Sequence, residues 1–177
     1  EGGIAIADVL FGDFNPAGRL PFSVPRSVGQ IPLYYNKKAP QSHDYVEMSA
    51  SPLYPFGYGL SYTSFDYSDL HLSALMPRSF EISFKVRNTG KYDGEEVAQL
   101  YLRDEYASVV QPLKQLKHFA RFYLKRGEER EVKFILSEED FSLVDRNLKK
   151  IVEPGTFQIM IGAASNDIRL QTKVEIK

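Results

Sequence analysis

The chain has 177 residues, of which 43% are hydrophobic and 25% are charged, so it has enough apolar side chains for a core and lacks the composition of a disordered segment. Its 22 basic and 23 acidic residues give a net charge of −1, and without a cationic excess the sequence predicts no nucleic-acid or membrane partner. There is no cysteine, which excludes disulfides and thiolate metal sites.

The first third of the chain is rich in proline and predicts one short helix. The spacing of Ile4, Ala7 and Phe11 favours a helix over residues 3–11, and Gly12 is a suitable left-handed stop. Most of the prolines follow within residues 1–60, and because proline fixes φ and lacks an N–H, they exclude long regular elements there: Pro16, Pro21, Pro25, Pro32, Pro40, Pro52 and Pro55.

Residues 1–60 are therefore predicted to follow an extended path over a surface. A nine-residue helix and a proline-rich segment have too few apolar side chains to bury a core. We expect this region to pack on a structure outside the chain, and Glu1, at the start of helix-like sequence, suggests that the chain is cut from a longer one.

Residues 61–177 show the alternation of apolar and polar side chains that is typical of half-buried strands. The clearest run is Phe80 to Val86, and Val97 to Leu102 is apolar on both faces apart from Gln99, as in a central strand. Seven strands are predicted, over residues 69–73, 79–88, 95–104, 114–124, 129–136, 156–163 and 168–176.

Seven short strands separated by turn signals predict a mainly β fold, a fibronectin type III-like (immunoglobulin-like) sandwich preceded by a short helix and an irregular proline-rich segment. The lack of tryptophan and of a cysteine pair disfavours a true immunoglobulin domain. Ser137 followed by three acidic residues predicts one helical turn between two strands.

Several strings resemble the C-terminal part of glycoside hydrolase family 3, which includes β-glucosidases and β-xylosidases. Residues 7–21 (ADVLFGDFNPAGRLP) resemble the end of the family's α/β-sandwich domain, and residues 52–65 (PLYPFGYGLSYTSF) resemble the junction with its fibronectin type III-like domain. Residues 88–90 and 93–101, together with 154–157 and 162–165, resemble strands and the last hairpin of that domain. The resemblance divides the chain into an α/β-domain tail, 1–60, and a fibronectin type III-like domain, 61–177.

The resemblance implies a retaining, exo-acting β-glycosidase that needs no cofactor and is periplasmic or secreted. Its partners would be the remaining catalytic domains of the parent chain and a β-linked oligosaccharide or glycoside. In the family the nucleophile and the acid/base lie upstream of this region, so we expect no catalytic residue here and no activity of the chain alone. Glu1 is the one carboxylate to test as an exception.

The loop between residues 31 and 45 holds the candidate sugar-rim residues, Tyr34, Tyr35 and His43, with a solvated loop as the alternative. Arg19 is either a structural clamp, with Asp8 or Asp13 as its carboxylate, or a sugar contact. The aromatic segment of residues 54–65 either plugs a domain interface or offers a stacking platform for sugars.

No metal site is predicted, because His71 and His118 lie in strands without a cluster of other ligands and are expected to be structural. The alternative function is a carbohydrate-binding or protein-interaction sandwich module. A carbohydrate-binding module needs an exposed row of rings, for which the candidates are Tyr101, Tyr106, Phe119 and Tyr123.

Overall fold

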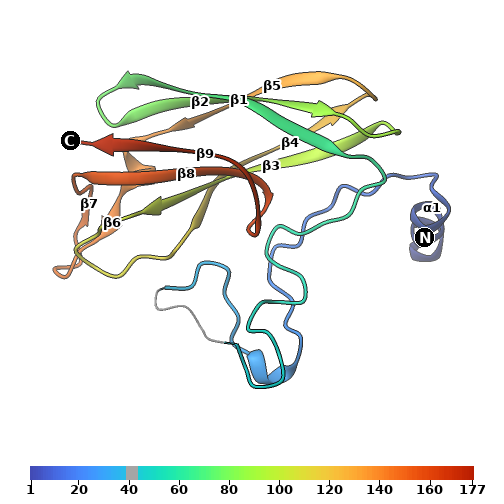
Figure 1. Cartoon of the computed structure of the whole chain (residues 1–177), viewed down its shortest axis with the longest axis horizontal. Coiled ribbons are helices and arrows are strands. Elements are labelled where there is room, and N and C mark those ends of the chain that lie inside the picture. Colours follow the sequence, from blue (N-terminus) through green and yellow to red (C-terminus); the bar gives the residue numbers. More distant parts are fainter. Residues whose placement is uncertain (39–43) are drawn as a thin grey trace.

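A computed structural model describes residues 1–38 and 44–177 and shows two antiparallel sheets packed face to face (Figure 1). The three-stranded sheet has the order β1 (Phe65–Met76), β2 (Ser79–Asn88), β5 (Glu129–Leu136). The four-stranded sheet has the order β4 (Gln115–Leu124), β3 (Gly94–Asp104), β8 (Gly155–Ala164), β9 (Asp167–Ile176). The predicted mainly β, antiparallel sandwich is confirmed.

The predicted strand ranges agree with the observed ones to within one residue, except for the first strand. β1 begins four residues before and ends three residues after the predicted range, because its register shifts twice: between Ser68 and His71, where Asp69 has a φ of 53°, and between Ala74 and Met76. The first shift moves the core-facing side chains from odd positions (Phe65, Tyr67) to even ones (Leu70, Leu72), so no single alternation runs through the strand.

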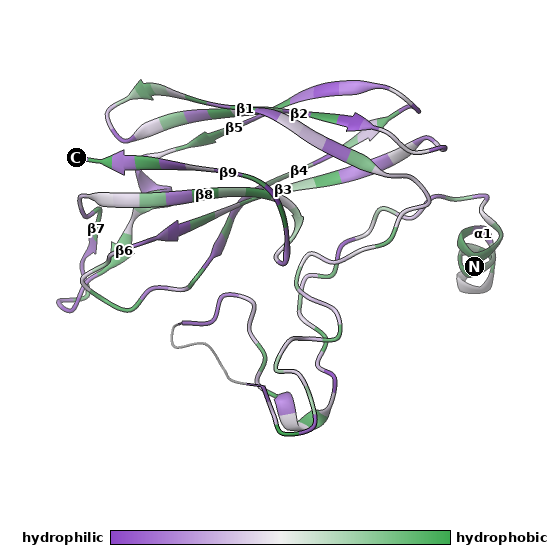
Figure 2. Cartoon of the chain, viewed as in Figure 1, coloured by the Kyte–Doolittle hydropathy of each residue, from purple (hydrophilic) through white to green (hydrophobic). Residues whose placement is uncertain are grey.

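Hydrophobic and hydrophilic residues alternate along several strands (Figure 2). The hydrophobic residues of both sheets form the core between them. Ile82, Phe84 and Val86 of β2 face Leu100 and other buried side chains of the four-stranded sheet. The predicted turn after Ser137 is the helical turn η2 (Glu138–Phe141), in which the Asp140 carboxylate accepts from the Ser137 N–H at 2.8 Å. A small hairpin, β6 (Leu143–Val144) with β7 (Lys150–Ile151), was not predicted because two-residue strands show no period.

Helix α1 (Gly2–Phe11) stands apart from the sandwich and buries none of its side chains (Figure 1). It ends at Gly12, whose φ of 89° confirms the predicted left-handed stop. Ile4, Leu10 and Phe11 are 68%, 72% and 85% exposed. The helix therefore presents an apolar surface that nothing in the described chain covers. No helix among residues 1–38 and 44–177 has the length and apolarity needed to cross a bilayer.

Residues 13–38 and 44–62, here called the strap, run below the sandwich as two extended arms that include the short helical turn η1 (Val28–Gln30) (Figure 1). The arms are joined by backbone hydrogen bonds from Leu20 N to Tyr58 O and from Gly57 N to Leu20 O, both 2.8 Å. Among the described residues before Phe65, the buried ones are Ala17, Gln30, Pro55, Gly57 and Thr63. So few apolar groups make no core, which confirms the predicted extended surface path.

Candidate functional site

The strap is fixed to the sandwich by a buried ion pair between Arg19 and Glu96 of β3. Arg19 Nη2 donates to Glu96 Oε1 at 3.1 Å and to Oε2 at 3.2 Å, and the two side chains are only 12% and 3% exposed. The Tyr67 hydroxyl donates to the same Oε1 at 3.1 Å. The prediction that Asp8 or Asp13 pairs with Arg19 is wrong, because strand β3 brings a carboxylate from 77 residues away. The geometry is that of a structural clamp.

The pKa of Tyr67 is raised well above its ordinary value, first because removal of its side chain from water disfavours the charged form and then because the Glu96 carboxylate opposes a second negative charge. The Arg169 guanidinium, 4.9 Å above the Tyr67 ring, acts in the opposite direction. Burial also raises the pKa of Tyr101, with a smaller contribution from Tyr35. Both tyrosines are therefore held neutral in the folded chain.

These raised pKa values predict a loss of stability at alkaline pH. A group whose pKa is higher in the folded state gives its full stabilisation below its unfolded pKa, about 10 for tyrosine, and loses it as the pH rises through the folded pKa. We expect the free energy of unfolding in urea to fall above pH 10, and to fall less in Tyr67→Phe. Absorbance at 295 nm should show the two tyrosines titrating late, and titration of every tyrosine near pH 10 in the folded chain would contradict the prediction.

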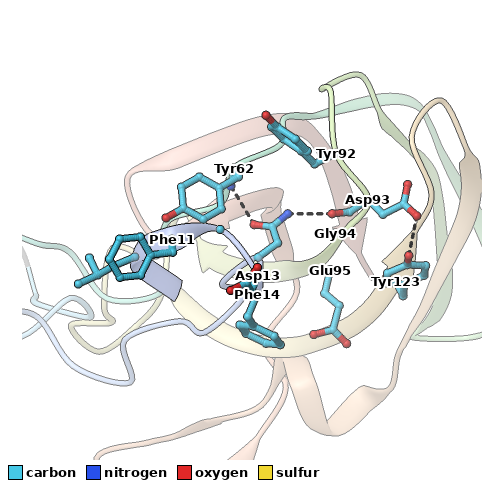
Figure 3. Close-up of a pocket in the computed structure, with 12 residues that line it drawn as sticks. Phe11, Asp13, Phe14, Tyr62, Tyr92, Asp93, Gly94, Glu95 and Tyr123 are labelled. Carbon is cyan, nitrogen blue, oxygen red and sulfur yellow. Dashed lines mark hydrogen bonds between the residues drawn. The ribbon is translucent and has the colours of Figure 1, made fainter. Parts of the chain in front are cut away.

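A second attachment lies where α1 leads into the strap, at a hollow of about 630 Å³. Figure 3 shows the residues that line it. Asn15 is its centre: Nδ2 donates to Asp93 O at 2.9 Å, and Oδ1 accepts from the Tyr62 N–H at 2.8 Å. The Tyr123 hydroxyl of β4 donates to the Asp93 carboxylate at 2.8 Å. These bonds hold the end of α1 against the loop between β2 and β3.

The walls of this hollow are aromatic and acidic and are open to solvent. The rings come from α1, the strap and the sandwich, and the carboxylates of Asp13 and Glu95 lie among them (Figure 3). Glu95 is paired with Arg121, and Phe11 is 85% exposed. Leu10 and Phe11, at the exposed end of α1, are among the residues that line the hollow.

A third attachment is an aromatic plug between the strap and the outer face of β3. Phe56 stacks on Tyr35 with ring centroids 4.0 Å apart, and Tyr35 meets Tyr101 edge-on at 6.2 Å. Gln99, 2% exposed, donates through Nε2 to Gly57 O at 3.3 Å and to Ala163 O at 2.6 Å. Gly57 has a φ of 80° and touches the Gln99 amide, so no larger residue fits there. Phe56 therefore acts as an interface plug, and Phe65 belongs to the sandwich core.

Of the candidate sugar-rim residues, Tyr34 and Tyr35 lie in the described part of the strap and differ in burial. Tyr34 is 64% exposed, whereas Tyr35 is half-buried and its hydroxyl accepts from the Leu116 N–H at 3.2 Å. His43 lies outside the described residues. Contact of these side chains with a sugar stays a prediction.

The two strand histidines have different surroundings. His118 Nε2 lies 3.4 Å from Asp140 Oδ1 and its ring stacks on Phe134, and His71 is exposed on β1. Within residues 1–38 and 44–177, no three histidine or carboxylate side chains come together closely enough to hold a metal ion.

The four rings proposed for a carbohydrate-binding face do not form one row. Tyr101 is fully buried under the strap, and Tyr106 is 82% exposed in the connection between β3 and β4. Phe119 and Tyr123, 67% and 50% exposed, share one face of β4. Only these two leave a ring surface that a sugar could reach on that sheet.

Sequence reasoning missed Glu96 and Asn15 as attachment points. Glu96 had a signal, since it is a charged residue at a core-facing position of a largely apolar strand, where burial requires a partner. Asn15 had none beyond its place in a turn, because its partners lie up to 78 residues away.

Comparison with known proteins gives two family matches. Residues 1–62 match the glycosyl hydrolase family 3 C-terminal domain, and residues 96–165 match the fibronectin type III-like domain. The clamp and the plug therefore join a segment of the first match to strands of the second.

Named relatives match nearly the whole chain. A periplasmic β-glucosidase of Salmonella typhimurium is 46% identical over 183 residues, which cover 96% of the chain and 24% of that protein. A β-xylosidase of Formosa agariphila is 45% identical over 177 residues, with the same coverage. The chain thus spans about a quarter of the length of these relatives.

Solved structures of β-glucosidases are similar to the chain over its whole length. A β-glucosidase from Erythrobacter marinus superposes with a TM-score of 0.93 at 42% identity, covering 100% of the chain and 24% of that structure. A mutant β-glucosidase from Listeria innocua, solved with laminaribiose, gives a TM-score of 0.92 at 37% identity, covering 100% of the chain and 26% of that structure.

Proposed function

Because the chain belongs to glycoside hydrolase family 3, as the C-terminal region of such an enzyme, we propose that it is the part of a retaining, exo-acting β-glycosidase in which the sandwich buttresses the catalytic domains. Retaining hydrolysis needs two carboxyl groups about 5–5.5 Å apart, a nucleophile and an acid/base. In this proposal both come from the part of the enzyme that precedes the chain. The substrate class is a β-glucoside or β-xyloside, because named relatives act on one or the other.

The observation that carries the proposal is the buried Arg19–Glu96 ion pair. It joins the segment that matches the family's C-terminal domain to the sandwich, with Glu96 buried and Arg19 largely shielded from solvent. Burying two charges is costly and is tolerated only where the geometry is fixed. A clamp of this kind suits a buttress that keeps one orientation relative to the strap. In this proposal the domain boundary lies between residues 60 and 61, near the end of the strap.

The proposal also covers the contacts of the chain with the other domains and with the substrate, and the location of the enzyme. The exposed apolar face of α1 and the hollow beside it are the surface on which the remaining catalytic domains would lie. The far end of the strap, with Tyr34, would lie at the sugar rim. The periplasmic β-glucosidase among the relatives supports a periplasmic or secreted location.

The isolated chain is expected to release no nitrophenol from an aryl β-glucoside or β-xyloside, because neither catalytic carboxyl group is proposed to lie in it. The positive control is the enzyme that contains the chain, assayed at equal molar concentration. Robust turnover by the purified chain would overturn the proposal. If such turnover disappeared in Glu1→Gln, the acid/base would have to be placed at Glu1.

A further inference from the structure

Residues 35–38, here called the tip of the strap, are attached to one connection of the sandwich, residues 105–114 between β3 and β4. Leu113 N donates to Lys37 O at 3.1 Å, and Lys38 forms an antiparallel bridge with Pro112. Just beyond the connection, Leu116 N donates to the Tyr35 hydroxyl at 3.2 Å. Three contacts within four residues of the strap make this tip an extension of the sandwich.

Tyr35 joins this attachment through both its ring and its hydroxyl. Its ring is stacked between strap and sheet, 4.0 Å from Phe56 and 6.2 Å from Tyr101, and its hydroxyl accepts a backbone N–H of β4. Tyr101 is fully buried, and its hydroxyl donates to Gln99, which is itself bonded to two carbonyls. Tyr35 therefore rests on a platform with little freedom to move.

Tyr34, the residue before Tyr35, is exposed to solvent. Its ring is 64% exposed and makes no hydrogen bond or ring contact within residues 1–38 and 44–177, so its position follows from the backbone that Tyr35 holds. We propose that Tyr35 is a positioning residue through which the sandwich sets the place of Tyr34 at the sugar rim. This inference rests on the proposed function, because the role of Tyr34 is part of it.

The test is a kinetic comparison in the enzyme that contains the chain, with an aryl β-glucoside as substrate. Tyr35→Ala is expected to raise KM about tenfold while kcat stays within about threefold, because a rim residue acts on binding and lies away from the reacting bond. Tyr34→Ala is expected to give the same pattern. Tyr35→Phe keeps the stack and loses only the hydrogen bond, so its KM should lie between those of the parent and Tyr35→Ala.

The control is Tyr106→Ala, which removes an 82% exposed ring from the same connection and should change neither constant. An unchanged KM in Tyr34→Ala would overturn the rim assignment in the proposed function. A raised KM in Tyr34→Ala but not in Tyr35→Ala would leave the rim in place and overturn the positioning role. A joint fall of kcat and melting temperature in Tyr35→Ala, without a rise in KM, would also overturn it, since it would show a merely structural role.

A second measurement needs no activity. In the isolated chain, the amides of Leu113 and Leu116 donate to the strap, so their hydrogen exchange should quicken in Tyr35→Ala and not in Tyr106→Ala. Equal protection in Tyr35→Ala and the parent chain would contradict the positioning role, whatever the kinetics show.

Discussion

Replacing Glu96 by alanine is expected to destabilise the docked strap by about 3–5 kcal/mol, because removing one partner of a buried ion pair leaves the other charge uncompensated. Arg19 is 12% exposed, and the same change takes the acceptor from the Tyr67 hydroxyl. The strap should then leave the sandwich so that Arg19 regains water. The amide of Ser165 reports this directly, since it donates to Phe56 O of the strap at 3.0 Å.

Two further variants test whether the effect of Glu96→Ala comes from the buried ion pair. Glu95→Ala removes the neighbouring carboxylate, whose pair with Arg121 is solvent-exposed, and should cost less than about 1 kcal/mol. The double variant Arg19→Met/Glu96→Leu should keep much of the docking that Glu96→Ala loses, because an apolar pair leaves no buried charge. If exchange at Ser165 in Glu96→Ala matched that in Glu95→Ala, the ion pair would not be what holds the strap.

The sandwich was predictable because its strands keep one face in the core. In β2 and β5 the alternation is unbroken, and the predicted and observed ranges agree. In β1 the register shift after Ser68 moves the core-facing side chains from odd to even positions. A search for strict alternation of apolar and polar residues therefore does not find the whole strand. Helix α1 was predictable for a local reason as well, since its apolar spacing and Gly12 lie within twelve residues.

The attachments of the strap were only partly predictable. The interface plug around Phe56 followed from aromatic residues beside glycine, and Gln99 stood out as a polar residue in a central strand. The partner of Arg19 did not follow, because the sequence offers nearer carboxylates and says nothing of which distant strand passes beneath the turn. Pairings across 77 residues are set by the packing of the sheets, and no local pattern encodes them.

Phe141→Ala is expected to lower the free energy of unfolding of the chain by about 3–5 kcal/mol, the usual cost of removing a buried phenylalanine ring. Phe141 ends the turn η2 and is 2% exposed. Its ring meets Phe157 edge-on at 5.1 Å and Phe80 at 5.9 Å, so it joins the two sheets at the end of the core. The matched control is Phe119→Ala, which removes a 67% exposed ring and should stay within about 0.5 kcal/mol. Urea unfolding of the isolated chain measures both.

The same variant also tests whether sandwich stability and strap docking are separate quantities. Neither Phe141 nor the rings that it meets belong to the clamp, and energies of sites without shared partners usually add. Phe141→Ala should therefore lower global stability while the strap undocks as rarely as before, and combined with Glu96→Ala the two losses should sum. A loss below about 1 kcal/mol in Phe141→Ala would mean that the sheets close without this ring. Faster undocking of the strap in Phe141→Ala would mean that the clamp depends on the far end of the core.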